Sequence, residues 1–324
     1  MEKFSAANWI PYKLNYIDNA KWTVNWLHLG SRRMTEPFFD DTIRICKMRQ
    51  RENVLPERLS SADFLMEAAH DLPSLQPSAF IFHVSRCGST LLSQAFTEPE
   101  ENIVIAEAPL LDEILRAAEK QKDISSSVQE TWLKAALQLM GQQRNFKETT
   151  YIIKLDSWHI HFYEQLRAWF PQSPFLFLYR KPSEVLASHQ KQRGIHTVPG
   201  MVNSALLKVD TSRPFNGDFN SYTADVLQQY YLGMQRIYKL NNVNNFFFDY
   251  AGGVKEMITQ FSQFTGINIK NQAQVDTRLG YHSKSANSVF KQDQALIDDE
   301  FFFKDCNDAY EHLKLMHHSI KDLK

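Results

Sequence analysis

The stretch from Phe80 to Leu92 constrains the fold most, because an apolar run is followed at once by a polar turn and a helix start. The run from Phe80 to Val84 is rich in residues that favour strands. Gly88 then allows a sharp turn or the close approach of a ligand. Ser89 and Thr90 are suited to cap a following helix. The sequence therefore predicts a buried strand, a tight turn and a helix in succession.

The turn at residues 85–90 has the chemistry of an anion site. Backbone N–H groups at a helix start point to one spot, and the helix dipole adds partial positive charge. Arg86 adds a full charge and a planar fork of donors, which suits a phosphate or sulfate. A strand, turn and helix also occur as plain α/β architecture, so the turn alone leaves both interpretations open. The P-loop of nucleotide triphosphatases needs a Lys before Ser or Thr, and no Lys follows Gly88.

Strand and helix patterns alternate from residue 79 onward. Short apolar runs predict strands at 79–84, 102–106, 150–155, 174–179 and 245–249. Continuous apolar runs of this kind fit central parallel strands that are covered on both faces. The pattern predicts an α/β fold: a P-loop-like, doubly wound parallel sheet of about five strands flanked by helices.

Helical spacing fills the intervals between these strands. It predicts helices that begin at Pro109, pass through 132–140, and occupy 159–170, 182–193, 222–240, 253–264 and either 294–302 or 305–316. Residues 194–220 have several Gly and Pro and little periodicity, which fits a lid loop or a surface excursion.

The domain organisation predicted from these patterns has two parts. Residues 1–76 form an accessory segment packed on the core, a helical N-terminal extension with short helices at 38–49 and 61–70. Residues 77–324 form the α/β domain, with the possible lid at 194–220. The role of the accessory segment and the oligomeric state are not predicted.

Composition narrows the functional classes. A net charge of −1 over 324 residues argues against a general nucleic-acid binder. No apolar run reaches the ~18 residues of a membrane span, and the first residues lack a signal-peptide core. Three widely spaced cysteines, Cys46, Cys87 and Cys306, predict neither a disulfide framework nor a zinc site. Because the cysteines do not suggest disulfides, the sequence favours a reducing compartment, and we expect a cytoplasmic protein. Cys87 has no Cys/His partner motif, which favours a packing role over a catalytic thiol.

Charged residues follow the predicted strands. Ligands of doubly wound sheets bind at the carboxyl ends of the strands. The residues found there are Arg86, Glu107, Lys154, Asp156, Arg180 and Asp249. Cations grouped with a carboxylate predict a polyanion site that contains a possible general base.

Two motifs together resemble the sulfotransferase superfamily, whose members use 3′-phosphoadenosine 5′-phosphosulfate as donor. The run Arg86-Cys-Gly-Ser-Thr90 is similar to the loop that binds the 5′-phosphosulfate. Arg180 at a strand end, with Ser188 eight positions later, is similar to the motif that binds the 3′-phosphate. The resemblance is closest to the branch with Arg in the loop, which includes tyrosylprotein and bacterial sulfotransferases. It covers residues 79–290.

The resemblance implies a role for each site residue. Backbone groups of residues 87–91, from Cys87, Gly88, Ser89, Thr90 and Leu91, would bind the phosphosulfate. Arg86 and Lys154 would neutralise charge on the sulfuryl group, with no metal. Glu107, 21 positions after Arg86, would be the base that takes a proton from a hydroxyl or amine acceptor.

The chain also departs from the family pattern. Cys87 stands where Ser is usual, and Val84-Ser85 where Pro often precedes the basic residue. The segment 278–285 is the nearest equivalent of the C-terminal donor clamp and would contribute Ser285 and Lys284, although a polar surface loop explains it as well.

Two other functions stay open. A P-loop-type small-molecule kinase would need magnesium, held by Asp156 or Asp249. A non-catalytic nucleotide-binding module would need neither Glu107 nor Lys154. His159 and His161 resemble a metal pair, but no third ligand stands out. Trp158 suits either adenine stacking or packing. The acceptor, a small molecule or a peptide, cannot be identified from the sequence.

Overall fold

The computed structural model describes residues 5–17, 21–52, 58–212, 215–270, 281–282, 285–289 and 303–319. A five-stranded parallel sheet has the order β5–β6–β4–β7–β8. Its strands are β4 (Ala79–His83), β5 (Asn102–Ala106), β6 (Thr150–Lys154), β7 (Phe175–Tyr179) and β8 (Asn245–Asp249). All five predicted strands are confirmed. The strand that precedes the polar turn is the central one, as in a doubly wound sheet.

Burial explains why these segments form strands. Every residue of β4 and β7 is buried, and so are the last four residues of β5 and β6. Phe177 stacks on Phe82 with ring centroids 4.8 Å apart and on Phe247 at 4.7 Å. The abundant phenylalanine of the sequence thus forms a ladder across neighbouring strands, which stabilises them by cross-strand packing.

The helices largely match the predicted spacing. Proline opens α4 (Pro109–Leu115) and α8 (Pro182–Lys191), as its fixed φ favours. The predicted option at 305–316 is confirmed by α14 (Lys304–Ser319), and the option at 294–302 lies outside the described residues. The others are α3 (Ser89–Ala95), α5 (Ala117–Lys120), α6 (Ser126–Met140), η1 (Ser157–Phe162), α7 (Tyr163–Trp169), α10 (Phe219–Lys239), η3 (Tyr250–Gly252) and α11 (Val254–Thr265). Among the described residues, no helix has the length and apolarity required to cross a membrane.

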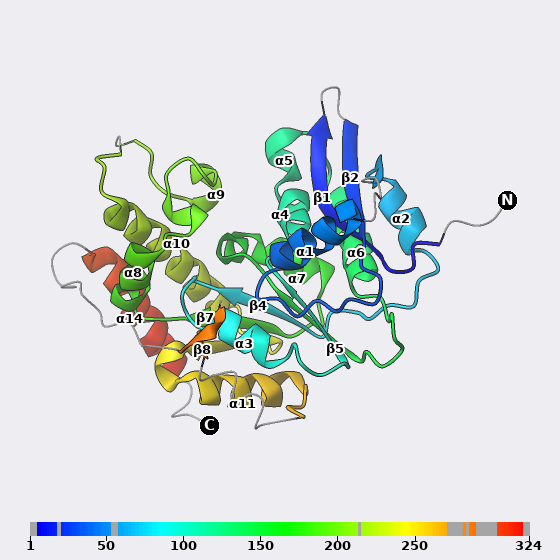
Figure 1. The fold of residues 1–324 in the computed structure, drawn as a ribbon. Coiled ribbons are helices and arrows are strands. Elements are labelled where there is room, and N and C mark those ends of the chain that lie inside the picture. Colours follow the sequence, from blue (N-terminus) through cyan, green and yellow to red (C-terminus); the bar gives the residue numbers. More distant parts are fainter. Residues whose placement is uncertain are drawn as a thin grey trace. The chain divides into compact units, whose positions relative to one another are not determined.

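The chain divides into two compact units. Unit 1 comprises residues 1–80 and 93–155, and unit 2 comprises residues 81–92 and 156–324. Within unit 1 the N-terminal segment packs on later helices: β1 (Trp9–Ile17) on α4 and α6, and α2 (Phe64–Ala69) on α6 (Figure 1). The predicted boundary between residues 76 and 77 stays a prediction.

The prediction that residues 1–76 are a helical extension is incomplete. The segment holds α1 (Phe39–Glu52) and α2 close to the predicted helices, but it also forms a three-stranded antiparallel sheet of β1, β2 (Lys21–His28) and β3 (Arg58–Ser61). Trp22, Val24 and Trp26 are buried, while Lys21, Thr23 and Asn25 between them and before them are more exposed. This alternation with a period of two is the strand signal, and it was present in the sequence.

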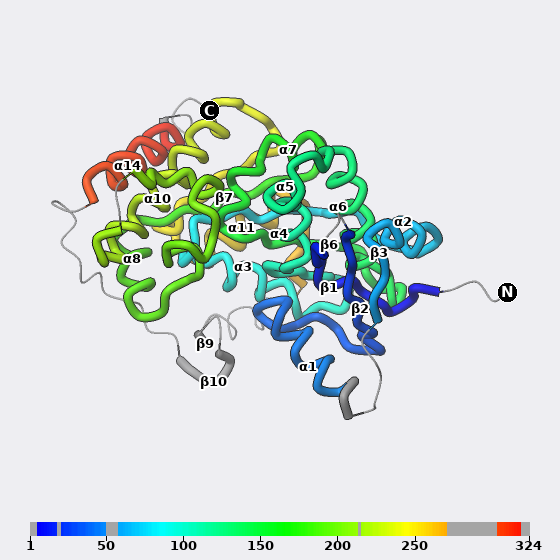
Figure 2. Tube along the Cα trace, turned by 90° about the horizontal axis from the view of Figure 1, so that it is seen from above, coloured from blue at the N-terminus to red at the C-terminus, as the bar shows by residue number. Residues whose placement is uncertain are grey.

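Unit 2 is organised around α10. The C-terminal helix α14 runs along it (Figure 2), and the Gln235 side chain donates a hydrogen bond of 2.7 Å to the carbonyl of Ala309. The predicted loop at 194–220 contains two short helices, η2 (Ile195–Thr197) and α9 (Ser204–Leu207). Residues 213–214 lie outside the described residues, and whether the loop acts as a lid stays a prediction.

Candidate functional site

The turn after β4 has an unusual backbone. The N–H of Val84 still donates to the carbonyl of Leu178, at 3.1 Å. The next residues turn left-handed, with φ of 74° at Ser85, 50° at Arg86 and 81° at Gly88. Two successive non-glycine residues in this region are costly and persist only where the surroundings hold them. Such strain is typical of functional turns.

Gly88 is required for two reasons. Its φ is left-handed, and a Cβ built on it would lie 2.4 Å from Cε2 of Tyr250. The carbonyl of Gly88 accepts the 2.9 Å hydrogen bond from Leu92 that opens α3. The turn is therefore packed directly against the aromatic ring that follows β8.

The other loop residues are buried. Cys87 is fully buried, and its Sγ lies 3.6 Å from the carbonyl oxygen of Leu178. This placement fits the packing role that the sequence favoured for its thiol. The side chains of Ser89, Thr90 and Leu91 are also buried at the start of α3.

Arg180 leaves the end of β7 and returns to the turn. Its Nη1 donates to the carbonyl of Arg86 at 2.9 Å, and its Nε donates to Oε2 of Glu184 at 2.5 Å. Its guanidinium carbon lies 4.7 Å from the centre of the Tyr250 ring, which is a cation–π contact. The structure thus brings together the two motifs, which are 94 residues apart. Ser188 is half-buried on α8.

Glu107 and Lys154 form a separate cluster in unit 1. The N–H of Glu107 donates to the carbonyl of Lys154 at 2.8 Å, and the two side chains form an ion pair. The Lys154 side chain is 1% exposed and that of Glu107 is 24% exposed. Glu107 is itself left-handed, with φ of 53°, and the ring of Phe38 lies 5.1 Å from Nζ of Lys154. A buried ammonium is costly without such a partner, so the pair explains how Lys154 is tolerated.

The weaker candidates have structural roles. Asp156 and His159 form a capping box at the start of η1, and the Nδ1 of His159 accepts from the backbone N–H of Asp156 at 3.2 Å. Burial lowers the pKa of His161 to about 3, so its imidazole is neutral. The Trp158 ring packs 6.0 Å from that of His196. These contacts support the structural interpretation of the His159–His161 pair.

Asp249 is likewise engaged. Its carboxylate accepts from the backbone N–H of Ala251 at 3.0 Å and from the hydroxyl of Tyr310 at 2.8 Å. Asp249 therefore caps η3, the short helix that directly follows it.

The C-terminal clamp is described only in part. Ser285 begins β10 (Ser285–Val289) and pairs with His282 of β9 (Tyr281–His282). Lys284 lies outside the described residues, so the contribution of Ser285 and Lys284 to the donor site stays a prediction.

Sequence patterns did not identify two residues beside the turn, Tyr250 and His189. Tyr250 directly follows Asp249, so the strand-end rule would have reached it one residue further on. His189 lies inside α8, and its hydrogen bond to Ser85 joins residues 104 positions apart. No local pattern signals a contact of that kind.

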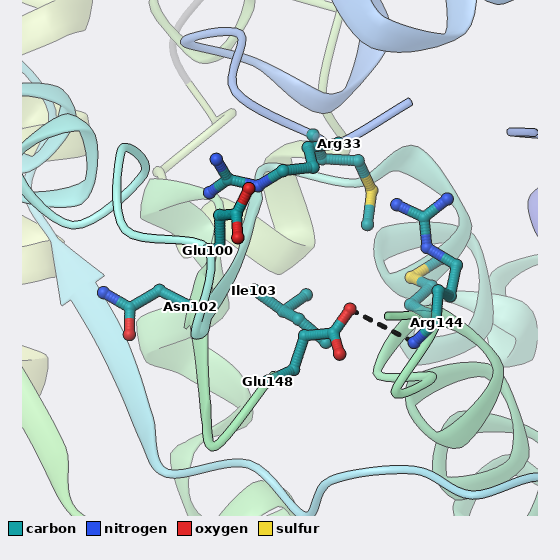
Figure 3. A pocket seen from close by; sticks show the side chains of 8 residues that line it. Arg33, Glu100, Asn102, Ile103, Arg144 and Glu148 are labelled. Carbon is teal, nitrogen blue, oxygen red and sulfur yellow. Dashed lines mark hydrogen bonds between the residues drawn. The ribbon is translucent and has the colours of Figure 1, made fainter. Parts of the chain in front are cut away.

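Unit 1 also contains a small polar cavity of about 20 Å³, at the amino end of β5 (Figure 3). Arg33 donates to the carbonyls of Thr97 and Pro99, at 2.6 Å each, and the N–H of Arg144 donates to Glu148 at 3.1 Å. This volume holds about one water molecule. The side chains around the cavity hold neighbouring segments together, and the cavity is too small for a ligand.

Comparison with known proteins gives structural neighbours alone. No protein-family model and no curated protein matches the chain. The sulfotransferase domain of the Synechococcus PCC 7002 olefin synthase is 13% identical, covers 75% of this chain and 96% of its own, and has a TM-score of 0.45. A sulfotransferase from Alicyclobacillus acidocaldarius is 13% identical, with coverages of 74% and 96% and a TM-score of 0.43. A mouse sulfotransferase complexed with PAP is 11% identical, with coverages of 82% and 93% and a TM-score of 0.38. At these scores the similarity carries no argument about activity, which rests on the residues described above.

Proposed function

We propose that the protein is a sulfotransferase that moves a sulfuryl group from 3′-phosphoadenosine 5′-phosphosulfate to a hydroxyl or amine acceptor. The observation that carries the proposal is the contact between Arg180 and the strained turn at residues 85–88. The turn with Arg86 is one cationic group, and the guanidinium of Arg180 is a second one. A ligand with phosphate on both ends of an adenosine requires this arrangement.

Each motif has its own role in donor binding. Arg86 and the backbone N–H groups of residues 87–91 bind the 5′-phosphosulfate, as oriented donors of this kind bind tetrahedral anions. Arg180 and Ser188 bind the 3′-phosphate, which ATP lacks. Arg180 is suited to this because its fork of donors binds phosphate bidentately and its plane is held by the Tyr250 ring.

Glu107 and Lys154 carry out the chemical step in this proposal. Each follows or ends a strand of the same sheet, β5 or β6. Sulfuryl oxygens compete with Glu107 for the Lys154 ammonium, and the freed carboxylate takes the acceptor proton. The acceptor oxygen or nitrogen forms a bond to sulfur while the bond from sulfur to the phosphate oxygen breaks. Lys154 and Arg86 neutralise the charge on the departing 3′,5′-bisphosphate.

The proposal needs no metal, since fixed cations neutralise the transferred group. The carboxylates that a magnesium-dependent kinase would use accept hydrogen bonds within the protein: Asp249 from Tyr310 and Ala251, and Asp156 in its capping box. The partner is an acceptor, a small molecule or a peptide. We place the reaction in the cytoplasm.

Turnover of labelled donor tests the proposal. The full-length protein is incubated with ³⁵S-labelled 3′-phosphoadenosine 5′-phosphosulfate, alone and with a panel of alcohols, phenols and amines. We expect release or transfer of label that Glu107→Gln reduces strongly and the surface variant Glu130→Gln leaves unchanged. Turnover that survives in Glu107→Gln would contradict the assigned base, and magnesium-dependent turnover of ATP would contradict the class of reaction.

A further inference from the structure

We propose that His189 is a positioning residue that links the donor loop to the start of the segment 194–218. Through this imidazole, occupancy of the donor loop changes the hydrogen bonding of Gly194. This inference rests on the proposed function and deepens it, because the loop at residues 85–90 is taken as the donor site.

Both ring nitrogens of His189 are engaged, and the side chain is fully buried. Nε2 lies 3.2 Å from the hydroxyl oxygen of Ser85, and Nδ1 accepts a hydrogen bond of 3.2 Å from the backbone N–H of Gly194. A backbone N–H can only donate, so Nδ1 carries no proton. In the neutral imidazole the proton is on Nε2, which donates to Ser85.

Ser85 is held on its other side as well. Its backbone N–H donates to Nδ1 of His83 at 3.0 Å. The left-handed φ of 74° is unfavourable for serine, so these two histidines supply the contacts that hold the strained residue. The neighbouring Arg86 side chain also donates to the carbonyl of Gln192, at the end of α8. The donor loop therefore contacts the end of α8 and the residues around it at two points.

Gly194 transmits this contact to the chain that follows it. Its carbonyl accepts from the N–H of Thr197 at 3.0 Å and from the Thr197 hydroxyl at 2.8 Å, which fixes η2. A Cβ on Gly194 would lie 2.8 Å from Cε1 of His196, so the packing leaves no room for a side chain. The other end of the segment is tied back, because Arg193 donates to the side chain of Asn220 at 3.0 Å.

A bound donor acts on this arrangement through Ser85 and Arg86. When Arg86 turns to the phosphosulfate, its contact with Gln192 weakens, while the hydrogen bond between His189 and Ser85 stays in place. A donor that immobilises Ser85 then also immobilises the His189 ring. The hydrogen bond from the Gly194 N–H to Nδ1 of His189 therefore opens less often. The expected signature is slower amide exchange at residues 192–198 when the donor site is occupied.

Two variants separate the two bonds of the imidazole. In His189→Gln, the side-chain amide nitrogen reaches the position of Nε2 and keeps the bond to Ser85, while the acceptor for Gly194 is lost. In His189→Asn, the side-chain oxygen takes the position of Nδ1 and keeps the bond to Gly194, while Ser85 is out of reach. His70→Gln, at an exposed position, is the matched control.

The experiment is hydrogen–deuterium exchange of the full chain, with and without 3′-phosphoadenosine 5′-phosphate, together with calorimetric titration of this nucleotide. In the wild type we expect the nucleotide to slow exchange in 192–198 several-fold. In His189→Gln the nucleotide still binds, but this slowing is lost. In His189→Asn the nucleotide binds more weakly, while exchange at 192–198 without nucleotide stays as in the wild type.

Other outcomes overturn the inference. Wild-type slowing in His189→Gln would show that another contact couples the two segments. If both His189 variants lost the same affinity for the nucleotide and the same thermal stability, His189 would have a packing role only. Gly194→Ala would then show whether displacing the segment alone has the same effect on affinity and stability. Failure of the wild type to bind the nucleotide contradicts the proposed function instead. In that case the exchange of unliganded Gly194 in the two variants still tests the two bonds.

Discussion

The two parts of the candidate site keep their geometry in different ways. In unit 1, Glu107 and Lys154 depend on side-chain charge, because a buried ammonium lies against a half-buried carboxylate. In unit 2, the turn at residues 85–88 depends on its backbone: three left-handed residues are held by Tyr250, Arg180 and two histidines. In the proposed function, the first part carries out the chemistry and the second part recognises the donor. Substitutions in the first part should therefore change the rate of transfer, and substitutions in the second part should change the affinity for the donor.

The largest effect is expected from Glu107→Gln. An amide still accepts a hydrogen bond from Lys154 but takes no proton, so we expect transfer to slow by roughly 10²–10⁴-fold. Affinity for 3′-phosphoadenosine 5′-phosphate should change little. Single-turnover kinetics and calorimetry measure the two quantities. A variant that loses affinity and rate together would break the proposed separation between the two parts.

Gly88→Ala tests the part that depends on the backbone. The added methyl group meets both a left-handed φ and the Tyr250 ring, so we expect a loss of about 2–4 kcal/mol in the free energy of unfolding. Gly200→Ala is the matched control, since its φ is +82° and nothing lies within 4 Å of the added Cβ. It should lose about 1 kcal/mol. Equal losses in urea denaturation would mean that the Tyr250 contact is unimportant.

Arg180→Ala should affect recognition more than rate. Loss of a charge-assisted bond to phosphate corresponds to about 1.5–3 kcal/mol, or roughly 10–100-fold in affinity. We expect this loss for 3′-phosphoadenosine 5′-phosphate and little change for adenosine 5′-phosphosulfate, which has no 3′-phosphate. The control is Arg236→Ala, in the exposed ion pair with Glu164. If the affinity for both nucleotides fell equally, Arg180 would stabilise the turn rather than contact the ligand.

The smallest effect concerns a second carboxyl group of unit 1, Glu113. Burial raises its pKa to about 7, and its Oε2 accepts from the N–H of Leu14 at 2.6 Å. The folded protein therefore holds this proton to a higher pH than the unfolded chain, which releases it near 4.5. The free energy of unfolding should fall as pH rises from about 5 to about 7, by about 1–2 kcal/mol.

Glu113→Gln removes that proton and should flatten this slope. Urea denaturation of wild type and variant at both pH values measures the difference. Parallel slopes in the two proteins would show that Glu113 is not the group that titrates.

The sequence predicted the sheet well because most residues of its strands are buried. A continuous apolar run such as Phe175–Tyr179 is bounded by Pro174 and Arg180 and leaves little ambiguity. The N-terminal strands were missed because the prediction for residues 1–76 named helices alone, whereas Trp22, Val24 and Trp26 alternate with less buried residues. Their pairing partner, β1, precedes them in the chain, and residues 18–20 between the two strands lie outside the described residues.

The candidate site was predictable where a motif is local, and less so where contacts are distant. The loop at residues 86–90 and the position of Arg180 follow from strand ends. The left-handed backbone at Ser85 and Arg86, the ring of Tyr250 behind Gly88 and the imidazole of His189 depend on tertiary packing. No short-range periodicity encodes such contacts.

The most direct test of the central claim is calorimetric titration of the wild type with two nucleotides, in buffer without magnesium. We expect 3′-phosphoadenosine 5′-phosphate to bind at least about tenfold more tightly than ATP, since Arg180 and Ser188 have a phosphate to contact in the first nucleotide alone. Equal affinity for the two nucleotides would contradict the central claim.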